Sequence, residues 1–164
     1  MSTYRNCIVF VLVFISINTI AQYNTSLGIR IGGTSGLSVK HFYKPTMAAE
    51  GILGTFGNGF SITMLLEKHM PVHEAVGLYV YYGGGAHLAF YNNNRSSNFG
   101  REIDTRQNNP VGFGINGIVG IEYRLPDNIP ISISLDLKPF IEVGSGGYVA
   151  VAADPSFGVK FILR

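Results

Sequence analysis

The sequence predicts an all-β fold in which eight antiparallel strands close into an up-and-down barrel. Apolar residues recur at every second position through most of the chain, and short segments rich in Gly, Pro or Asn separate the alternating runs. No segment shows the 3.6-residue period of a helix. Of the 164 residues, 46% are hydrophobic and 13% are charged. This charged share, about half the usual one, excludes a disordered chain. The lack of a Lys/Arg cluster argues against a nucleic-acid partner.

The pattern of the first 21 residues is typical of a cleaved signal peptide. Arg5 precedes the apolar run Cys7–Ile17, and Thr19 and Ala21 would occupy the −3 and −1 positions of a small-x-small cleavage site. This run is too short to cross ~30 Å of hydrocarbon as a helix. We therefore expect a signal peptide over residues 1–21 and one barrel domain over residues 22–164. Cleavage would remove Cys7, the only cysteine, and with it any disulfide or Cys metal ligand.

The first half of the barrel domain predicts four strands separated by short turns. Pro45 cannot donate to a ladder, and Gly57-Asn58-Gly59 is a strong hairpin signal. We expect strands over residues 26–32, 37–43, 47–56 and 60–67. The connections are expected at residues 34–36, 44–46, 57–59 and 68–76.

The second half predicts four longer strands and two larger loops. The alternation runs through residues 77–91, 111–125, 131–143 and 157–163. We expect residues 92–110 to form a polar loop without strands, 126–130 a tight turn and 144–154 a second soft loop.

The strand face opposite the apolar residues carries a balanced set of charges. It holds five basic and five acidic side chains, namely Arg30, Lys40, Arg124, Lys138, Lys160, Glu50, Glu67, Glu122, Asp136 and Glu142. In a soluble barrel these ten residues would form the hydrated surface. In a membrane barrel they would fill a narrow polar lumen. An even strand number, long strands and larger loops on alternate connections favour the transmembrane barrel, whose closure leaves no backbone group unpaired in lipid. Four tyrosines are expected at the membrane interfaces: Tyr43, Tyr82, Tyr91 and Tyr123.

Five segments of the sequence resemble those of a known protein family. They are Leu27–Phe42, Ala49–Leu53, Leu78–His87, Gly117–Arg124 and Pro130–Ile141. In these the chain resembles the small outer-membrane β-barrel proteins, OmpA/OmpX-like, of the Bacteroidetes type. The resemblance implies an eight-stranded barrel in the cell outer membrane, both termini in the periplasm, and no defined activity for most members. Such barrels usually end in an aromatic residue, whereas this chain ends Phe161-Ile162-Leu163-Arg164. The atypical Arg164 bears on how efficiently the barrel inserts.

No motif predicts catalysis, a cofactor or a metal. Gly112-x-Gly114-x-x-Gly117 matches the dinucleotide fingerprint, but a period-two strand follows it where a helix is required. His69 and His73 have zinc-ligand spacing, but Pro71 between them favours a turn with two exposed histidines. His87 is expected to be a hydrogen-bonded lumen residue rather than a general acid or base.

These observations predict a structural or surface-interaction protein of the outer membrane with a charge-plugged lumen. The candidate surface loop comprises Asn92, Asn93, Asn94, Arg95, Arg101, Glu102, Asp104 and Arg106. The expected partners are outer-membrane lipid, the barrel-insertion machinery and an extracellular ligand of this loop, with the protein a monomer. Two alternatives stay open: a soluble periplasmic or secreted barrel that binds a small apolar ligand inside, and a lipid-modifying outer-membrane enzyme with a Ser/His/acid set near its rim.

Overall fold

The computed structural model describes residues 25–57, 59–92, 96–98, 101–103, 111–126, 129–145, 147 and 149–163. These residues form β1 (Thr25–Gly32), β2 (Ser35–Lys44), β3 (Met47–Phe56), β4 (Gly59–Pro71), β5 (Leu78–Tyr91), β6 (Ser96–Asn98), β7 (Arg101–Ile103), β8 (Val111–Arg124), β9 (Ile131–Gly144) and β10 (Val149–Leu163). Among them, no helix is long and apolar enough to span a membrane. The predicted signal peptide lies outside the described residues.

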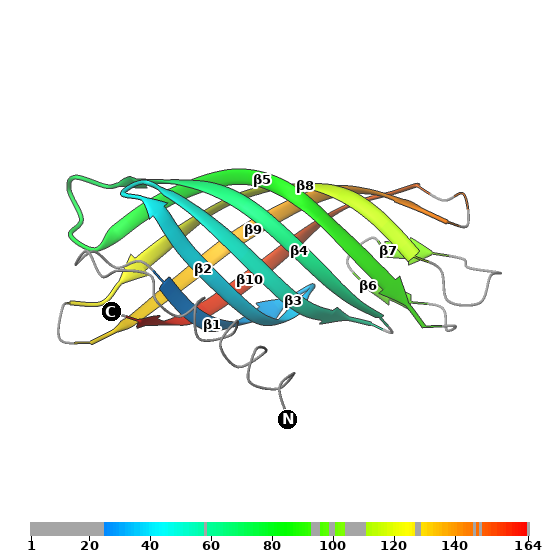
Figure 1. The fold of residues 1–164 in the computed structure, drawn as a ribbon, viewed down its shortest axis with the longest axis horizontal. Coiled ribbons are helices and arrows are strands. Elements are labelled where there is room, and N and C mark those ends of the chain that lie inside the picture. The colour runs from blue at the N-terminus through cyan, green and yellow to red at the C-terminus, as the bar shows by residue number, and fades with distance from the viewer. Residues whose placement is uncertain are drawn as a thin grey trace, which may run out of the picture.

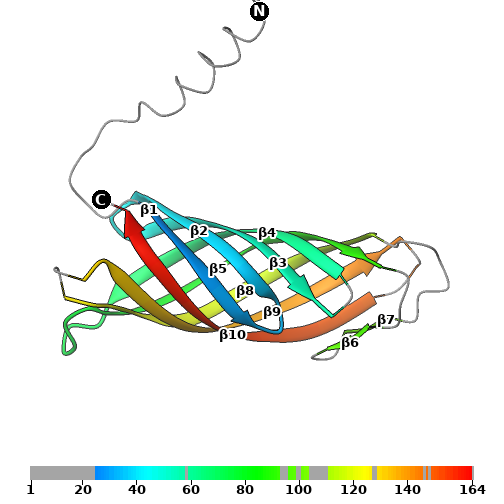
Figure 2. The ribbon, with the colours of Figure 1, turned by 90° about the horizontal axis from the view of Figure 1, so that it is seen from below.

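The eight longer strands form a closed antiparallel barrel in the order β1-β10-β9-β8-β5-β4-β3-β2 (Figure 1). The first and last strands close it, with Gly28 opposite Lys160 and Ile31 opposite Phe157 (Figure 2). Each strand of the barrel therefore has two hydrogen-bonded neighbours, and the sheet has no open edge. The predicted all-β, eight-stranded, up-and-down fold is confirmed.

The barrel has two distinguishable ends. The terminal end carries Thr25 and Leu163, and there β2 passes into β3, β4 into β5 and β8 into β9. The loop end carries Gly32, Phe56, Tyr91 and Gly144, where β1, β3, β5 and β9 finish. In Figure 1 the terminal end lies on the left and the loop end on the right.

Two strand boundaries differ by more than two residues from those that the sequence predicted, and one segment expected to lack strands contains two. β4 continues beyond residue 67 to Pro71, because the residues through Pro71 lie opposite β5. β10 begins at Val149 instead of residue 157, because residues 149–155 pair with β9. The 92–110 segment, expected to lack strands, contains the two-stranded ribbon β6–β7, which lies beside β10 (Figure 2).

The two faces of the barrel wall differ in polarity. Outward-facing apolar side chains are exposed on every barrel strand, for example Met64 at 62% and Val151 at 67%. The inner face carries Ser, Thr and charged side chains together with a few apolar ones, among them Ile52, Leu65 and Ile118. The apolar face of the wall therefore points outward, which contradicts the apolar interior that the alternative of a small-ligand barrel required.

Candidate functional site

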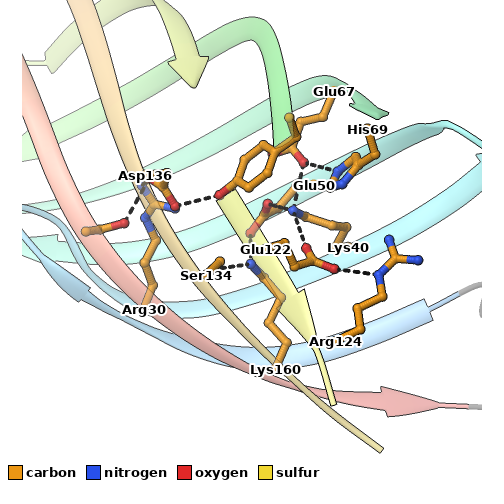
Figure 3. A network of polar contacts seen from close by, with 12 residues as sticks. Arg30, Lys40, Glu50, Glu67, His69, Glu122, Arg124, Ser134, Asp136 and Lys160 are labelled. Carbon is orange, nitrogen blue, oxygen red and sulfur yellow. Dashed lines mark hydrogen bonds and ion pairs between the residues drawn. The ribbon is translucent and has the colours of Figure 1, made fainter. Parts of the chain in front are cut away.

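Lys40 lies at the centre of a network of charges inside the barrel (Figure 3). Its Nζ is 2.7 Å from a Glu67 carboxylate oxygen, 3.0 Å from Glu50 and 3.4 Å from Glu122. The four residues come from β2, β3, β4 and β8, and all are buried. The alternation of β2 places Lys40 inside, because Leu37 and Val39 occupy the outward positions. One ammonium group therefore contacts carboxylates from three other strands.

Two further cations extend this network at the same carboxylates. Lys160 on β10 has its Nζ 3.3 Å from Glu50, and it donates a hydrogen bond of 3.4 Å to the Ser134 hydroxyl. Arg124 on β8 donates from Nε to Glu122 at 3.0 Å, and its guanidinium lies 3.9 Å from the centre of the Tyr79 ring. Glu50 and Glu122 thus each contact two cations, which offsets part of the cost of burying them.

A second group is built on Asp136 of β9. Arg30 of β1 donates to both carboxylate oxygens, at 2.9 and 2.5 Å, in a bidentate pair. Tyr81 and Ser156 also donate their hydroxyls to this carboxylate, at 2.9 and 3.0 Å. The Tyr81 ring connects this group to the first, because the Lys40 ammonium lies 4.4 Å from its centroid.

His69 belongs to this network, contrary to the prediction of an exposed turn. It lies on β4 with its side chain buried, its Nε2 3.0 Å from Glu67. Its ring stacks on Tyr81 with a centroid separation of 4.9 Å. His73 is exposed in the connection after β4. The two histidines are separated because Pro71 ends the strand after residue 69 has already taken its inward position. No cluster of potential metal ligands occurs among the described residues.

A third group occupies the loop half of the interior. His87 contacts Asn116 through Nδ1 and Glu142 through Nε2, both at 2.6 Å. Tyr91 donates its hydroxyl to the same Glu142. Its side chain is buried, so the prediction of Tyr91 as an interface aromatic is wrong; Tyr43, Tyr82 and Tyr123 do point outward and are exposed.

Asp154 is an interior acid that the sequence reasoning assigned to a loop. Its carboxylate lies 3.1 Å from Lys138 Nζ and accepts a hydrogen bond of 2.9 Å from the Thr34 backbone N–H. The apolar residues Val149 and Val151 alternate with Ala150, Ala152 and Asp154 at the start of β10. That alternation is the signal that would have placed Asp154 inside.

Most of the predicted lumen charges lie inside the barrel, whereas most of the predicted surface loop lies outside the described residues. Nine of the ten predicted lumen charges are buried inside the barrel, and Arg124 is partly exposed at the terminal end. Of the predicted surface loop, Asn92 is exposed, and Arg101 and Glu102 lie on β7. Asn93, Asn94, Arg95, Asp104 and Arg106 lie outside the described residues, as does Arg164.

Two glycines of β8, Gly114 within the apparent nucleotide fingerprint and Gly120 beyond it, make room for interior side chains. Gly114 lies on β8 against the His87 ring, and a Cβ there would collide with the ring. At Gly120, further along the same strand, a Cβ would come within 2.7 Å of Tyr81 Cζ and 2.6 Å of Asp136 Cβ. These glycines therefore permit the contacts of His87 and Tyr81, and no helix follows them as a dinucleotide site would require.

An eight-stranded closed barrel with an apolar outer wall and a charged interior has the architecture of the transmembrane β-barrel class. The chain is similar to the crystal structure of the N-terminal β-barrel domain of Pseudomonas aeruginosa OprF, with a TM-score of 0.62 and 14% sequence identity. The match covers 85% of this chain and 95% of the OprF domain. No protein-family model and no curated protein matches the sequence. The likeness shows a shared fold.

Proposed function

We propose that the protein is an outer-membrane β-barrel with a structural or surface-interaction role. The observation that carries this proposal is the polarity of the wall: apolar side chains such as Leu66 (61%) and Ile115 (60%) are exposed, while nine charged predicted lumen residues are buried. A belt of exposed apolar surface around a whole protein is unfavourable in water and favourable in hydrocarbon. Export through a signal peptide over residues 1–21 belongs to the proposal, and so does an affiliation with the Bacteroidetes-type barrels.

The proposal includes a narrow lumen closed by paired charges. Its support is that side chains from strands across the barrel meet inside it, as Lys40 of β2 meets Glu122 of β8. The Arg30–Asp136 pair likewise joins β1 to β9, two strands that are not neighbours in the sheet. An interior filled in this way holds the strands together and leaves no wide aqueous path.

The proposed role does not include catalysis. A lipid-modifying barrel would need a Ser/His/acid set near its rim. His87 instead contacts Asn116 and Glu142, and its ring packs edge-on against Phe140 at 5.4 Å. These contacts support a structural role for His87, since they hold its ring between an amide, a carboxylate and an aromatic ring.

The proposed partners follow from location. Outer-membrane lipid would cover the wall, and the barrel-insertion machinery would recognise the strands near Phe161. The 92–110 segment, which includes the β6–β7 ribbon, would present the contact surface for an extracellular ligand. We propose a monomer, because the closed sheet leaves no strand edge to pair with a second copy.

Fractionation of cells that express the full chain tests the location. We expect the protein in the outer-membrane fraction, extractable only by detergent, and migrating faster in an unheated SDS gel than after boiling. A soluble periplasmic protein measured in the same cells controls for leakage between fractions. Recovery of the chain in the soluble periplasmic fraction would overturn the proposal.

A further inference from the structure

The charged side chains on the outer wall of the barrel lie close together at its terminal end. Through the eight barrel strands, the outward-facing residues that the structure describes are apolar or uncharged, with two exceptions, Lys44 on β2 and Lys68 on β4. His41, also outward, shares a hydrogen bond of 2.9 Å with Thr25. Both lysines are exposed and lie at the terminal end.

A β-bulge turns Lys44 outward. The register between β2 and β3 shifts between Phe42 and Lys44, so Tyr43 has no partner of its own and Lys44 lies opposite Met47. Phe42 points inside, and strict alternation would therefore turn residue 44 inside as well. The bulge instead exposes Tyr43 and Lys44 together on the outer wall.

The register aligns the two lysines across neighbouring strands. Lys44 lies opposite Met47, Met47 opposite Lys68, and Lys68 opposite Tyr82. Strands two apart are separated by about 10 Å, which the long, flexible side chains of two lysines can span to reach one group between them. Tyr43 and Tyr82, exposed at 46% and 47%, flank the pair.

Both ammonium groups are available for a ligand. The ion pairs of the described residues engage Lys40, Lys138 and Lys160, but neither Lys44 nor Lys68. Paired cations beside exposed tyrosines, at the border of an apolar wall, complement an anionic group attached to an apolar body. A phospholipid has this chemistry, with a phosphate at the interface and acyl chains against the wall.

We propose that Lys44 and Lys68, flanked by Tyr43 and Tyr82, bind the phosphate of an anionic phospholipid on the outside of the barrel. This inference rests on the proposed function, because it requires the wall to lie in a membrane. The terminal end would face the periplasm, so the bound lipid belongs to the inner leaflet. The acyl chains would lie along outward apolar residues of β3 and β4 such as Leu53 and Met64.

Native mass spectrometry of the full chain in detergent micelles tests the site. The probes are phosphatidylglycerol and phosphatidylcholine with identical acyl chains, added in equal amounts. We expect the wild-type protein to retain phosphatidylglycerol in preference to phosphatidylcholine. The Lys44→Gln/Lys68→Gln variant should lose about thirtyfold in this preference, given the usual contribution of each of two interfacial lysines. The Lys44→Arg/Lys68→Arg variant should retain it, because Arg also binds phosphate.

A matched control separates a local site from general charge. Thr55, outward and exposed on β3 near the loop end, can be changed to Lys in the double-Gln background. The added charge should not restore the preference, since it lies at the other end of the wall. Restoration by Thr55→Lys would overturn the proposal, as would a wild-type protein that retains both lipids equally.

The same samples distinguish failure of the site from failure of the proposed function. A heat-modifiable band in unheated SDS gels reports a folded barrel for each variant. A folded, detergent-dependent barrel without lipid preference contradicts the lipid site alone. A chain that is soluble without detergent contradicts the membrane barrel, and with it the lipid site.

Discussion

The Tyr81 hydroxyl donates a hydrogen bond of 2.9 Å to Asp136 Oδ2 inside the barrel. Tyr81 comes from β5 and Asp136 from β9, on either side of β8. They can meet across β8 because Gly120 lies between them without a side chain. This contact, together with the Lys40 ammonium over the Tyr81 ring, joins two groups of interior charges into one network.

Removal of the Tyr81 hydroxyl should destabilise the barrel. In Tyr81→Phe, Asp136 loses one of its donors, and loss of a hydrogen bond to a buried charged group costs about 1–3 kcal/mol. Urea unfolding in detergent micelles, followed by the heat-modifiable band, measures the change. Tyr82→Phe is the control, since the neighbouring Tyr82 points outward and should unfold within about 0.5 kcal/mol of wild type. Equal stability of the two variants would contradict the role given to Tyr81.

Lys40 should be the most sensitive of the interior charges. Lys40→Met leaves three buried carboxylates without their shared cation, and uncompensated buried charge typically costs about 3–5 kcal/mol. The same unfolding measurement applies. Lys44→Met, four residues along β2 but outside, should have a small effect on the free energy of unfolding. Adding Glu67→Gln to Lys40→Met should recover part of the loss, because Glu50 and Glu122 keep Lys160 and Arg124 while Glu67 loses its lysine. No loss of stability in Lys40→Met would show that the network is not structural.

Gly120 should not tolerate a side chain. In Gly120→Ala the methyl group would lie within 2.7 Å of Tyr81 Cζ and of the Leu135 carbonyl oxygen. Overpacking of this kind costs about 1–3 kcal/mol. Gly51→Ala is the matched control, because its methyl group would meet only Met64 Sδ at 3.7 Å. The prediction is wrong if both alanine variants unfold at the same urea concentration.

The filled interior should exclude sugars from passage. Liposomes that contain the purified chain should not swell when placed in an isosmotic solution of a small sugar. Liposomes with a wide porin provide the positive control, and heat-modifiable mobility shows that the chain is inserted. Swelling at a rate that depends on the amount of inserted wild-type protein would contradict the plugged lumen.

The alternation of apolar residues was sufficient to predict the fold and the inward direction of residues such as Arg30 and Lys40. It failed at the strand ends. Pro71 suggested a turn and so hid His69, although Pro71 is the last residue of β4 and His69 before it pairs with β5. The small residues before Asp154 suggested a loop, although pairing with β9 holds them in β10.

The partners of each interior charge could not be predicted from the sequence. Arg30 and Asp136 are 106 positions apart, and their contact depends on the register of every intervening strand. The bulge at Tyr43 shows the same limit. The alternation in the sequence assigns residue 44 to a turn. Only the pairing of β2 with β3 shows that Lys44 points outward.

The seam between β1 and β10 determines when the barrel can be completed. Ile29 lies opposite Val159, so the first strand obtains its second row of hydrogen bonds only from the last. A chain truncated before β10 would leave β1 and β9 as two unpaired edges, which hydrocarbon does not tolerate. Among the strand pairs that the structure describes, the pair that closes the sheet has the longest sequence separation, and such contacts form slowly. The barrel therefore cannot assemble in parts. Until the fifteen residues of β10 are available, no partial barrel is stable in a bilayer.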